Sequence, residues 1–267
     1  MRRVLVTLAA LAAWSAGCAV FVDTDGFTSG GPGAGDAGTA PADADASDAA
    51  PEPGPALNDG VDGAAPDGTA PEGFVDMFDR ADGVVGNGWI ENESGVFSIS
   101  GGRVVAKSGN WVTRYLYRPA NEDVRDVETS VEIAWATTPP ENCDATLILR
   151  AQRADGKLSA YATFINDRKE ISISRIDRGV EQYFGSRSLP EPINTTDTYR
   201  LRFRVEGTMP VVLVSTFERS TTSGWTTMAT YSLTDDDTKR IEAAGSVGVT
   251  SDQYATFSYD TFTRTNL

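Results

Sequence analysis

The sequence predicts an all-β domain, an antiparallel β-sandwich, that follows a long acidic N-terminal region. Three observations lead to this fold class: short segments alternate strictly between apolar and polar residues, turn residues separate them about every 8–12 residues, and no long helical pattern interrupts them. A period of two is typical of strands with one buried face. About 195 residues follow the acidic region, which is enough for one hydrophobic core.

Residues 1–17 have the layout of a secretory signal peptide. Two arginines near the start precede an apolar run at 4–14, and small residues follow it. A charged start, a short apolar stretch and a small-residue exit direct a chain out of the cytoplasm. Because the apolar run is too short to span a bilayer stably, we interpret it as a removable signal.

The exit from this signal reads SAGC at 15–18 and resembles the lipobox of bacterial lipoproteins. The resemblance implies cleavage before Cys18, diacylation of its thiol and acylation of the new amino terminus with chains such as palmitate. Ser15 stands where the family prefers Leu, and an ordinary signal peptide with a cysteine at its cleavage site is the alternative. Several acyl chains would anchor the protein to a membrane essentially permanently. Since Asp, the inner-membrane retention signal of enteric-type bacteria, does not follow Cys18, we expect a lipid-anchored protein of the bacterial cell envelope, at the outer membrane.

Residues 18–72 form an acidic linker between the signal and the domain. They contain eleven acidic residues, seven prolines and no Lys or Arg, and consist mainly of Ala, Gly, Asp, Pro, Thr and Ser. This composition cannot bury enough apolar surface to offset chain entropy, so we predict a disordered spacer. A flexible coil of roughly 50 residues reaches about 40 Å. Calcium binding at 23–26 and 43–45 is the alternative, although both segments lack the closing Glu of a calcium loop.

The domain spans residues 73–267, and its two clearest strands are 127–135 and 199–205. Apolar residues and Thr alternate with Glu, Ser and Ala in the first, and apolar residues alternate with arginines in the second. The other expected strands cover residues 96–99, 102–107, 112–118, 146–152, 159–166, 170–176, 211–218, 225–232, 245–250 and 254–263. One short helix is expected at 235–242, where three aspartates at the start and basic residues later suit the helix dipole.

The polar positions of the two clearest strands carry opposite charges. Glu128 and Glu132 project from one strand, and Arg200, Arg202 and Arg204 project from the other. If the two strands are neighbours in one sheet, the charges meet across it, and each pair contributes about 0.2–1 kcal/mol. We interpret the set as a solvated ladder; a polar, concave binding surface is the alternative.

The composition excludes several classes of function. The chain has no histidine, which removes imidazole bases and histidine metal ligands. Its two cysteines, Cys18 and Cys143, cannot build a zinc or iron–sulfur site. With Cys18 lipidated, Cys143 is interpreted as a small apolar filler or a partly exposed thiol. The net charge is −15 and no basic run is present, so nucleic acid is not expected as a partner.

A series of short motifs runs through the domain. It opens with FDRADG at 78–83, followed by Gly86 and Trp89. Later segments read DVE at 126–128, LILRAQ at 147–152, YRLR at 199–202, GSVGV at 245–249 and FSYDTF at 257–262. Together, the motifs resemble those of bacterial concanavalin A-like, laminin G-like jelly rolls. The resemblance implies two antiparallel sheets stacked face to face, with the first and last strands adjacent. Such folds host lectins, carbohydrate-binding modules, glycosidases and adhesion units, so the fold does not assign a function.

Sugar-binding jelly rolls often hold a structural calcium ion that ties the first strand to the last. Asp79 lies in the first motif and Asp260 in the last. The resemblance therefore implies these two carboxylates as calcium ligands, with backbone carbonyl oxygens completing the shell. Two surface acids near the chain ends are the alternative.

A sugar-binding surface needs aromatic rings that stack on the sugar and polar groups that read its hydroxyls. The candidate ligand-binding residues are Trp111, Tyr115, Arg150, Gln152, Tyr161 and Trp225. Trp111 and Tyr115 share one face of a strand with Tyr117, because the three positions have the same parity. Placement in the core is the alternative for these aromatic side chains.

Catalysis is not expected. Related hydrolases carry their carboxylates in a tight Glu-x-Asp-x-x-Glu run, whereas Glu128 and Glu132 are about 13 Å apart along a strand. We therefore expect a membrane-anchored, non-catalytic binding module for a glycan or another cell-envelope component. A structural or adhesion unit with protein partners is the first alternative, and a glycoside hydrolase-like enzyme is the second.

Overall fold

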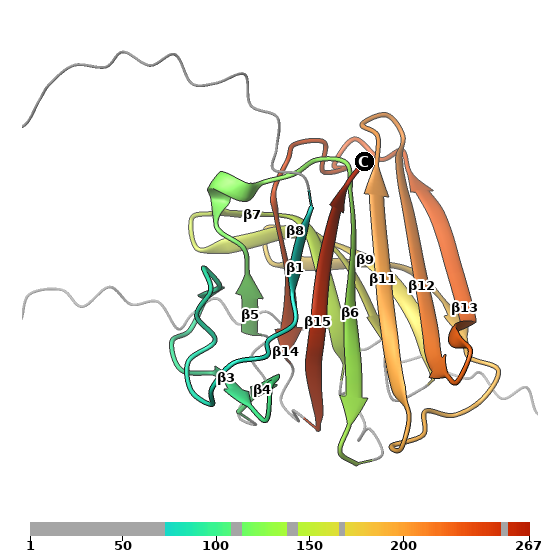
Figure 1. The fold of residues 1–267 in the computed structure, drawn as a ribbon. Coiled ribbons are helices and arrows are strands. Elements are labelled where there is room, and N and C mark those ends of the chain that lie inside the picture. The colour runs from blue at the N-terminus through green and yellow to red at the C-terminus, as the bar shows by residue number, and fades with distance from the viewer. Residues whose placement is uncertain (1–72, 108–113, 138–143, 166–168, 252–255) are drawn as a thin grey trace, which may run out of the picture. The chain divides into compact units, whose positions relative to one another are not determined.

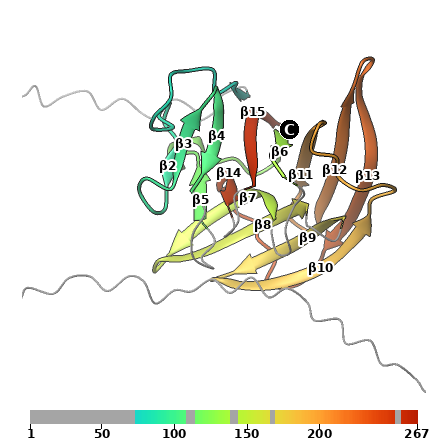
Figure 2. The same ribbon diagram turned by 90° about the horizontal axis from the view of Figure 1, so that it is seen from below.

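The computed structural model describes residues 73–107, 114–137, 144–165, 169–251 and 256–267. Within these residues the regular structure is almost entirely strand, arranged as two layered antiparallel sheets, sheet A and sheet B (Figure 1 and Figure 2). The predicted all-β sandwich is confirmed. Cys18, Trp111 and Cys143 lie outside the described residues. No helix in the described part of the chain is long and apolar enough to cross a membrane.

Sheet A has eight strands in the order β13-β12-β11-β6-β15-β4-β3, with β1 also paired to β15. These strands are β1 (Phe74–Asp76), β3 (Phe97–Ser100), β4 (Arg103–Ala106), β6 (Val127–Trp135), β11 (Thr198–Glu206), β12 (Val211–Thr221), β13 (Gly224–Asp235) and β15 (Phe257–Asn266). The pairing of β1 with β15 confirms that the first and last strands of the domain are adjacent.

Sheet B has seven strands in the order β10-β9-β8-β7-β14-β5-β2. These strands are β2 (Ile90–Glu91), β5 (Arg114–Tyr117), β7 (Ala145–Ala154), β8 (Lys157–Ile165), β9 (Glu170–Asp177), β10 (Val180–Ser188) and β14 (Ser246–Ser251). All strand pairs within the sheet are antiparallel.

The two sheets enclose a hydrophobic core because alternate residues of each strand point between them. In β6, Val127, Val131 and Ile133 are completely buried, while the glutamates between them stay partly exposed. In β11, Leu201 and Phe203 are completely buried and alternate with arginines. The inward faces predicted for both strands are therefore confirmed.

The charged ladder on the outer face of sheet A is also confirmed. β6 and β11 are direct neighbours, and their register places Arg200 opposite Glu132. In the same register Arg204 lies opposite Glu128. Arg202, between the two arginines, forms an ion pair with Glu128. Opposite charges therefore meet across the two strands.

Strand β10 was not predicted from the sequence. It is a nine-residue edge strand of sheet B, and its sequence VEQYFGSRS does not alternate cleanly. A bulge between Tyr183 and Gly185 shifts its register against β9. An edge strand buries less of its surface and needs fewer apolar residues, so it carries a weaker period-two signal.

The prediction of a helix at 235–242 is wrong, since β13 continues through Asp235 and turns follow it. The Asp235 carboxylate is buried and accepts hydrogen bonds from the Tyr161 hydroxyl and the Arg175 guanidinium, both at 2.8 Å. These contacts with sheet B hold the residue in an extended strand. Within the described residues, the helical structure is a single 3-10 turn at Ala120–Glu122.

A buried carboxylate organises the start of the domain. Asp76, at the end of β1, accepts hydrogen bonds from Arg80 at 2.8 and 3.1 Å. It also accepts one from Asn87 at 3.0 Å and one from the Trp89 indole at 2.8 Å. Burial alone would raise the pKa of Asp76, but these hydrogen bonds outweigh burial and hold the pKa at about 2. Trp89 is thereby fixed edge-on against Phe262 of β15, with 5.0 Å between ring centroids.

Candidate functional site

The outer face of sheet B carries an apolar cluster that is separate from the core between the sheets. Its members are Tyr115, Ile148, Ala151, Leu158, Ala160, Ala162 and Ile176, and Tyr117 packs against them. We name this surface the sheet B face. The seven cluster members are each at most 7% exposed, so the cluster is a small second core on the outer side of sheet B rather than an open apolar patch.

Strand alternation builds the sheet B face. In β5, Leu116 is completely buried in the core, which directs Tyr115 and Tyr117 outward. In β8, core-facing side chains alternate with Ala160 and Ala162 on the outer side. Because alanine side chains are small, they leave more room on the outer side of β8 than larger residues would.

A glycine lets β14 approach β5 beside these tyrosines. Gly248 lies opposite Tyr117 in the register of the two strands. A Cβ atom at Gly248 would come within 2.3 Å of the Leu116 carbonyl oxygen and 2.9 Å of the Tyr117 Cβ. Any larger residue would therefore push the strands apart or displace the tyrosine ring.

A cavity of about 350 Å³ lies on the sheet B face. Its lining consists of Tyr115, Tyr117, Ala120, Asp123, Ile148, Ala151, Gln152, Arg153, Leu158 and Ser246. The apolar members come from strands, apart from Ala120 of the 3-10 turn, and the polar members come from strand ends and the loop before β6. Its volume falls in the range of small-molecule sites, which combine an apolar wall with a few placed polar groups.

The polar groups of this cavity are held by specific contacts. The Ser246 hydroxyl donates to the Asp123 carboxylate at 2.9 Å, and burial raises the pKa of Asp123. Gln152 donates its side-chain amide to the Ala244 carbonyl at 3.1 Å. Arg153 donates to the Tyr117 hydroxyl at 3.3 Å, and its guanidinium carbon lies 5.6 Å from the centre of the Tyr117 ring. A carboxylate, an amide, a guanidinium and two aromatic rings thus surround one space.

Two of the six ligand-binding residues predicted from the sequence meet at this cavity, Tyr115 and Gln152. Trp225 lies on β13, in the other sheet, where the Arg200 guanidinium carbon sits 4.4 Å from its ring centre. Trp225 therefore lies beside Arg200 of sheet A and does not line the cavity that contains Tyr115. Trp111 lies outside the described residues.

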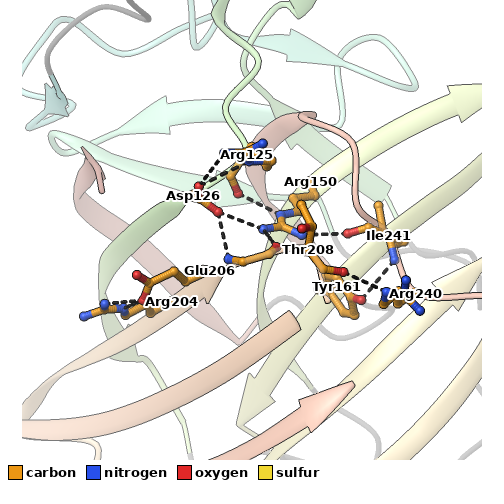
Figure 3. Close-up of polar contacts among 10 residues, drawn as sticks. Arg125, Asp126, Arg150, Tyr161, Arg204, Glu206, Thr208, Arg240 and Ile241 are labelled. Atoms are coloured by element: carbon orange, nitrogen blue, oxygen red, sulfur yellow. Dashed lines mark hydrogen bonds and ion pairs between the residues drawn. The ribbon is translucent and has the colours of Figure 1, made fainter. Parts of the chain in front are cut away.

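The prediction that Arg150 binds a ligand is corrected by its burial, which is complete. Its guanidinium donates to three backbone carbonyl oxygens, those of Arg125, Gly207 and Ile241, each at 2.7 Å. It also contacts the Asp126 carboxylate at 3.2 Å (Figure 3). These contacts tie several loops and strand ends together, so Arg150 acts as a structural crosslink.

The prediction that Tyr161 binds a ligand is corrected in the same way, since the Tyr161 side chain is also completely buried. Its hydroxyl donates to Asp235 at 2.8 Å and accepts from the Ile241 amide at 3.0 Å. Burial, and next the hydrogen bond to Asp235, raise its pKa, so the hydroxyl stays protonated. Figure 3 shows Tyr161 and Arg150 converging on the segment that contains Ile241.

The residues present do not fit the calcium ion expected between Asp79 and Asp260. The described residues contain no group of three or more acidic or cysteine side chains that could hold a metal ion. Asp260 forms an ion pair with Arg103 at 3.1 Å, and Asp79 is exposed beyond β1. The carboxylate that organises the first strand is Asp76, and its partners are protein hydrogen-bond donors.

Three polar residues of the cavity could not be identified from the sequence: Asp123, Arg153 and Ser246. Asp123 lies in a loop, and its contact Ser246 is 123 residues away in the chain. Arg153 follows Gln152 near a hairpin turn and has no pattern that distinguishes it from other surface arginines. One signal was available for a neighbouring residue: the shared parity of Tyr117 and Tyr115 places both rings on the same side of β5.

Comparison with known proteins identifies the fold. No protein-family model and no curated protein matches the chain. Among solved structures, the lectin UEA-II complexed with galactose is 12% identical, with a TM-score of 0.52, over 74% of this chain and 100% of that chain. The exoplasmic/lumenal domain of VIP36, in its Ca²⁺-bound form, is 10% identical, with a TM-score of 0.51, over 73% of this chain and 90% of that chain.

A carbohydrate-binding module from Bacillus subtilis, CBM66, is 14% identical over 67% of this chain and 92% of that chain, with a TM-score of 0.44. At identities this low the likeness concerns the fold, and function has to be argued from the site. The described domain of this chain has the two-sheet, all-β sandwich of lectin-like, concanavalin A-like jelly rolls.

Proposed function

We propose that the domain is a non-catalytic, glycan-binding module whose site is the cavity on the sheet B face. The observation that carries this proposal is the lining of the cavity. Two tyrosines stand beside an apolar floor, and Asp123, Gln152 and Arg153 surround the same space. The likeness of the fold to a lectin solved with galactose adds support.

The geometry suits a sugar ring better than a purely apolar ligand. The apolar side of a pyranose can pack against Tyr115 and Tyr117, and its hydroxyl groups can exchange hydrogen bonds with the polar groups. Asp123 accepts hydrogen bonds, Arg153 donates them, and the Gln152 amide can do both. Vicinal hydroxyls need this mixture of donors and acceptors.

We further propose that Cys18 is lipidated and that residues 18–72 act as a spacer holding the module away from the outer membrane. The signal-like pattern at 1–17 and the SAGC sequence at 15–18 support this proposal. Mass spectrometry of the mature chain should find an N-terminal Cys18 that carries acyl chains. A mature chain with an unmodified cysteine would contradict membrane anchoring, and the glycan site would be unaffected.

A glycan array probed with the full chain tests the binding site. We expect binding to a defined set of glycans, and we expect Gln152→Ala and Arg153→Ala each to weaken it about fivefold to tenfold, because each removes a hydrogen bond to the sugar. Arg202→Ala, on the outer face of sheet A, is the matched control and should bind like the unaltered chain. A flat array combined with capture of a cell-envelope protein would instead support an adhesion unit.

The same protein tests the enzymatic alternative. One observation favours that alternative: Glu132 lies opposite Asp260, and burial, followed by the nearby Asp260 charge, raises the pKa of Glu132 as a general acid requires. This pair sits in sheet A and does not line the cavity on the sheet B face. We expect no turnover of an aryl glycoside; turnover that Glu132→Gln removes would establish a glycosidase.

A further inference from the structure

A second, much smaller cavity of about 40 Å³ adjoins the glycan site. Tyr115 and Ile148 line both spaces, so the two cavities are neighbours on the sheet B face. We name the smaller space the slot. The rest of its lining consists of Asp144, Thr146, Ala162, Phe164, Ser174, Ile176, Glu181 and Thr250.

The slot combines apolar walls with hydroxyl groups. Ile148, Ala162 and Ile176 contribute aliphatic carbon, and Phe164 contributes a ring. The hydroxyls belong to one tyrosine, one serine and two threonines. A group that fits here is small and partly apolar, and a carbonyl oxygen on it can accept hydrogen bonds from these hydroxyls. The carboxylates of Asp144 and Glu181 complete the polar part of the lining.

Two of these hydroxyls have no hydrogen-bond partner among the residues that the structure describes. The Tyr115 Oη and Ser174 Oγ atoms are buried without a partner, and the two side chains are only 4% and 0% exposed. Leaving buried hydroxyls unpaired is unfavourable, so such groups often mark the place of a ligand or an ordered water. Burial raises the pKa of Tyr115 to about 12, which keeps its hydroxyl protonated and able to donate.

We propose that the slot receives the acetamido group of an N-acetylated sugar whose ring occupies the larger cavity. The methyl of such a group packs against Ile148, Ala162 and Ile176, while its carbonyl oxygen accepts hydrogen bonds from the unpaired hydroxyls. The assignment rests on the proposed glycan site and specifies which sugars that site prefers. An unsubstituted hydroxyl at the same position fills the slot poorly and leaves its apolar walls uncovered.

Matched pairs of sugars test this preference with the full chain. N-acetylglucosamine is compared with glucose, and N-acetylgalactosamine with galactose, by isothermal titration calorimetry. We expect the N-acetylated sugar of at least one pair to bind about tenfold more tightly, because a site that pairs with a polar group discriminates strongly against an analogue lacking it.

Two variants locate the preference in the slot. Ala162 and Ser174 line the slot and are absent from the lining of the larger cavity. Ala162→Leu fills the slot and should remove the preference, while binding of the unsubstituted sugar is retained. Ser174→Ala deletes one donor and should reduce the preference about fivefold. Thermal melting of each variant establishes whether it is folded. If Ala162→Leu does not fold, Ser174→Ala alone tests the assignment.

The outcomes separate this inference from the proposed function. Equal affinities within both pairs would mean that the slot holds water only, which overturns the acetamido assignment and leaves the glycan site standing. A preference that survives unchanged in the folded variants would overturn it as well. If no sugar or array glycan binds the unaltered chain, the glycan site and the assignment fail together.

Discussion

The outer faces of the two sheets are built by the same alternation of residues, yet one face is charged and the other is largely apolar. On sheet A the outward positions hold arginines and glutamates that pair across neighbouring strands. On sheet B they hold alanine, leucine, isoleucine and tyrosine together with serine and threonine. Alternation builds the sandwich, whereas the identity of the outward residues gives each face its own chemistry.

The two faces differ little in the volume of their cavities. A cavity of about 310 Å³ also lies on sheet A, similar in size to the 350 Å³ cavity on sheet B. The sheet A cavity is lined by charged groups that already have partners: Arg202 pairs with Glu128, and Arg204 pairs with Glu206. A ligand there would have to compete with those ion pairs. The slot beside the sheet B cavity instead contains two hydroxyls that have no partner among the described residues.

Introducing a charged residue on each face should give the largest difference in folding stability between the two faces. Leu158 of the sheet B cluster is 3% exposed, so Leu158→Asp should cost about 3 kcal/mol of folding free energy and abolish glycan binding. Val212 of sheet A is 38% exposed and lies opposite Glu206, so Val212→Lys should change stability by less than about 0.5 kcal/mol. Urea unfolding measures both. Equal losses in the two variants would mean that the faces do not differ in this way.

A smaller and pH-dependent effect should separate the buried carboxylate Asp76 from a carboxylate of the exposed ladder. The folded pKa of Asp76 is about 2, below its ordinary value of 3.8. The stability that this difference supplies is therefore complete above about pH 5 and is lost as the pH falls through 4 towards 2. Asp76→Asn should cost about 2 kcal/mol at pH 7 and much less at pH 2.

Glu128→Gln is the matched control for that experiment. Glu128 pairs with Arg202 on the surface, where both side chains are about one third exposed, so the change should stay below about 1 kcal/mol. Chemical unfolding of the three proteins between pH 2 and pH 7 provides the measurement. A cost of Asp76→Asn that does not vary with pH would show that its charge does not stabilise the domain.

The strands with clean alternation could be predicted, because a period of two depends only on neighbouring residues. Strand β6 was predicted with its observed limits at 127 and 135, and the facing charges of β6 and β11 followed from the same pattern. Strand β10 and the segment after Asp235 could not be predicted in this way. Their conformations depend on an edge position and on buried contacts made with other strands.

The positions of individual site residues could be predicted only in part. Alternation alone places Arg150 on the outward side of β7 with Ile148, but a bulge with a positive φ of 51° at Arg150 redirects its side chain into the interior. Tyr161 stands in a strand that is apolar on both sides, so the sequence could not say which side faces the core. The position of Trp225 could not be predicted without knowing the sheet to which β13 belongs.

By itself, the sequence determined a β-sandwich behind an acidic segment, and it placed Tyr115 and Tyr117 on one side of a strand, because periodicity and composition are local properties. Only the tertiary structure decided that this side faces outward above alanines, and that Asp123 and Ser246 meet there across 123 residues of chain. Which residues share a cavity depends on strand order, bulges and loop contacts. Those are set by the packing of the whole domain rather than by any single segment.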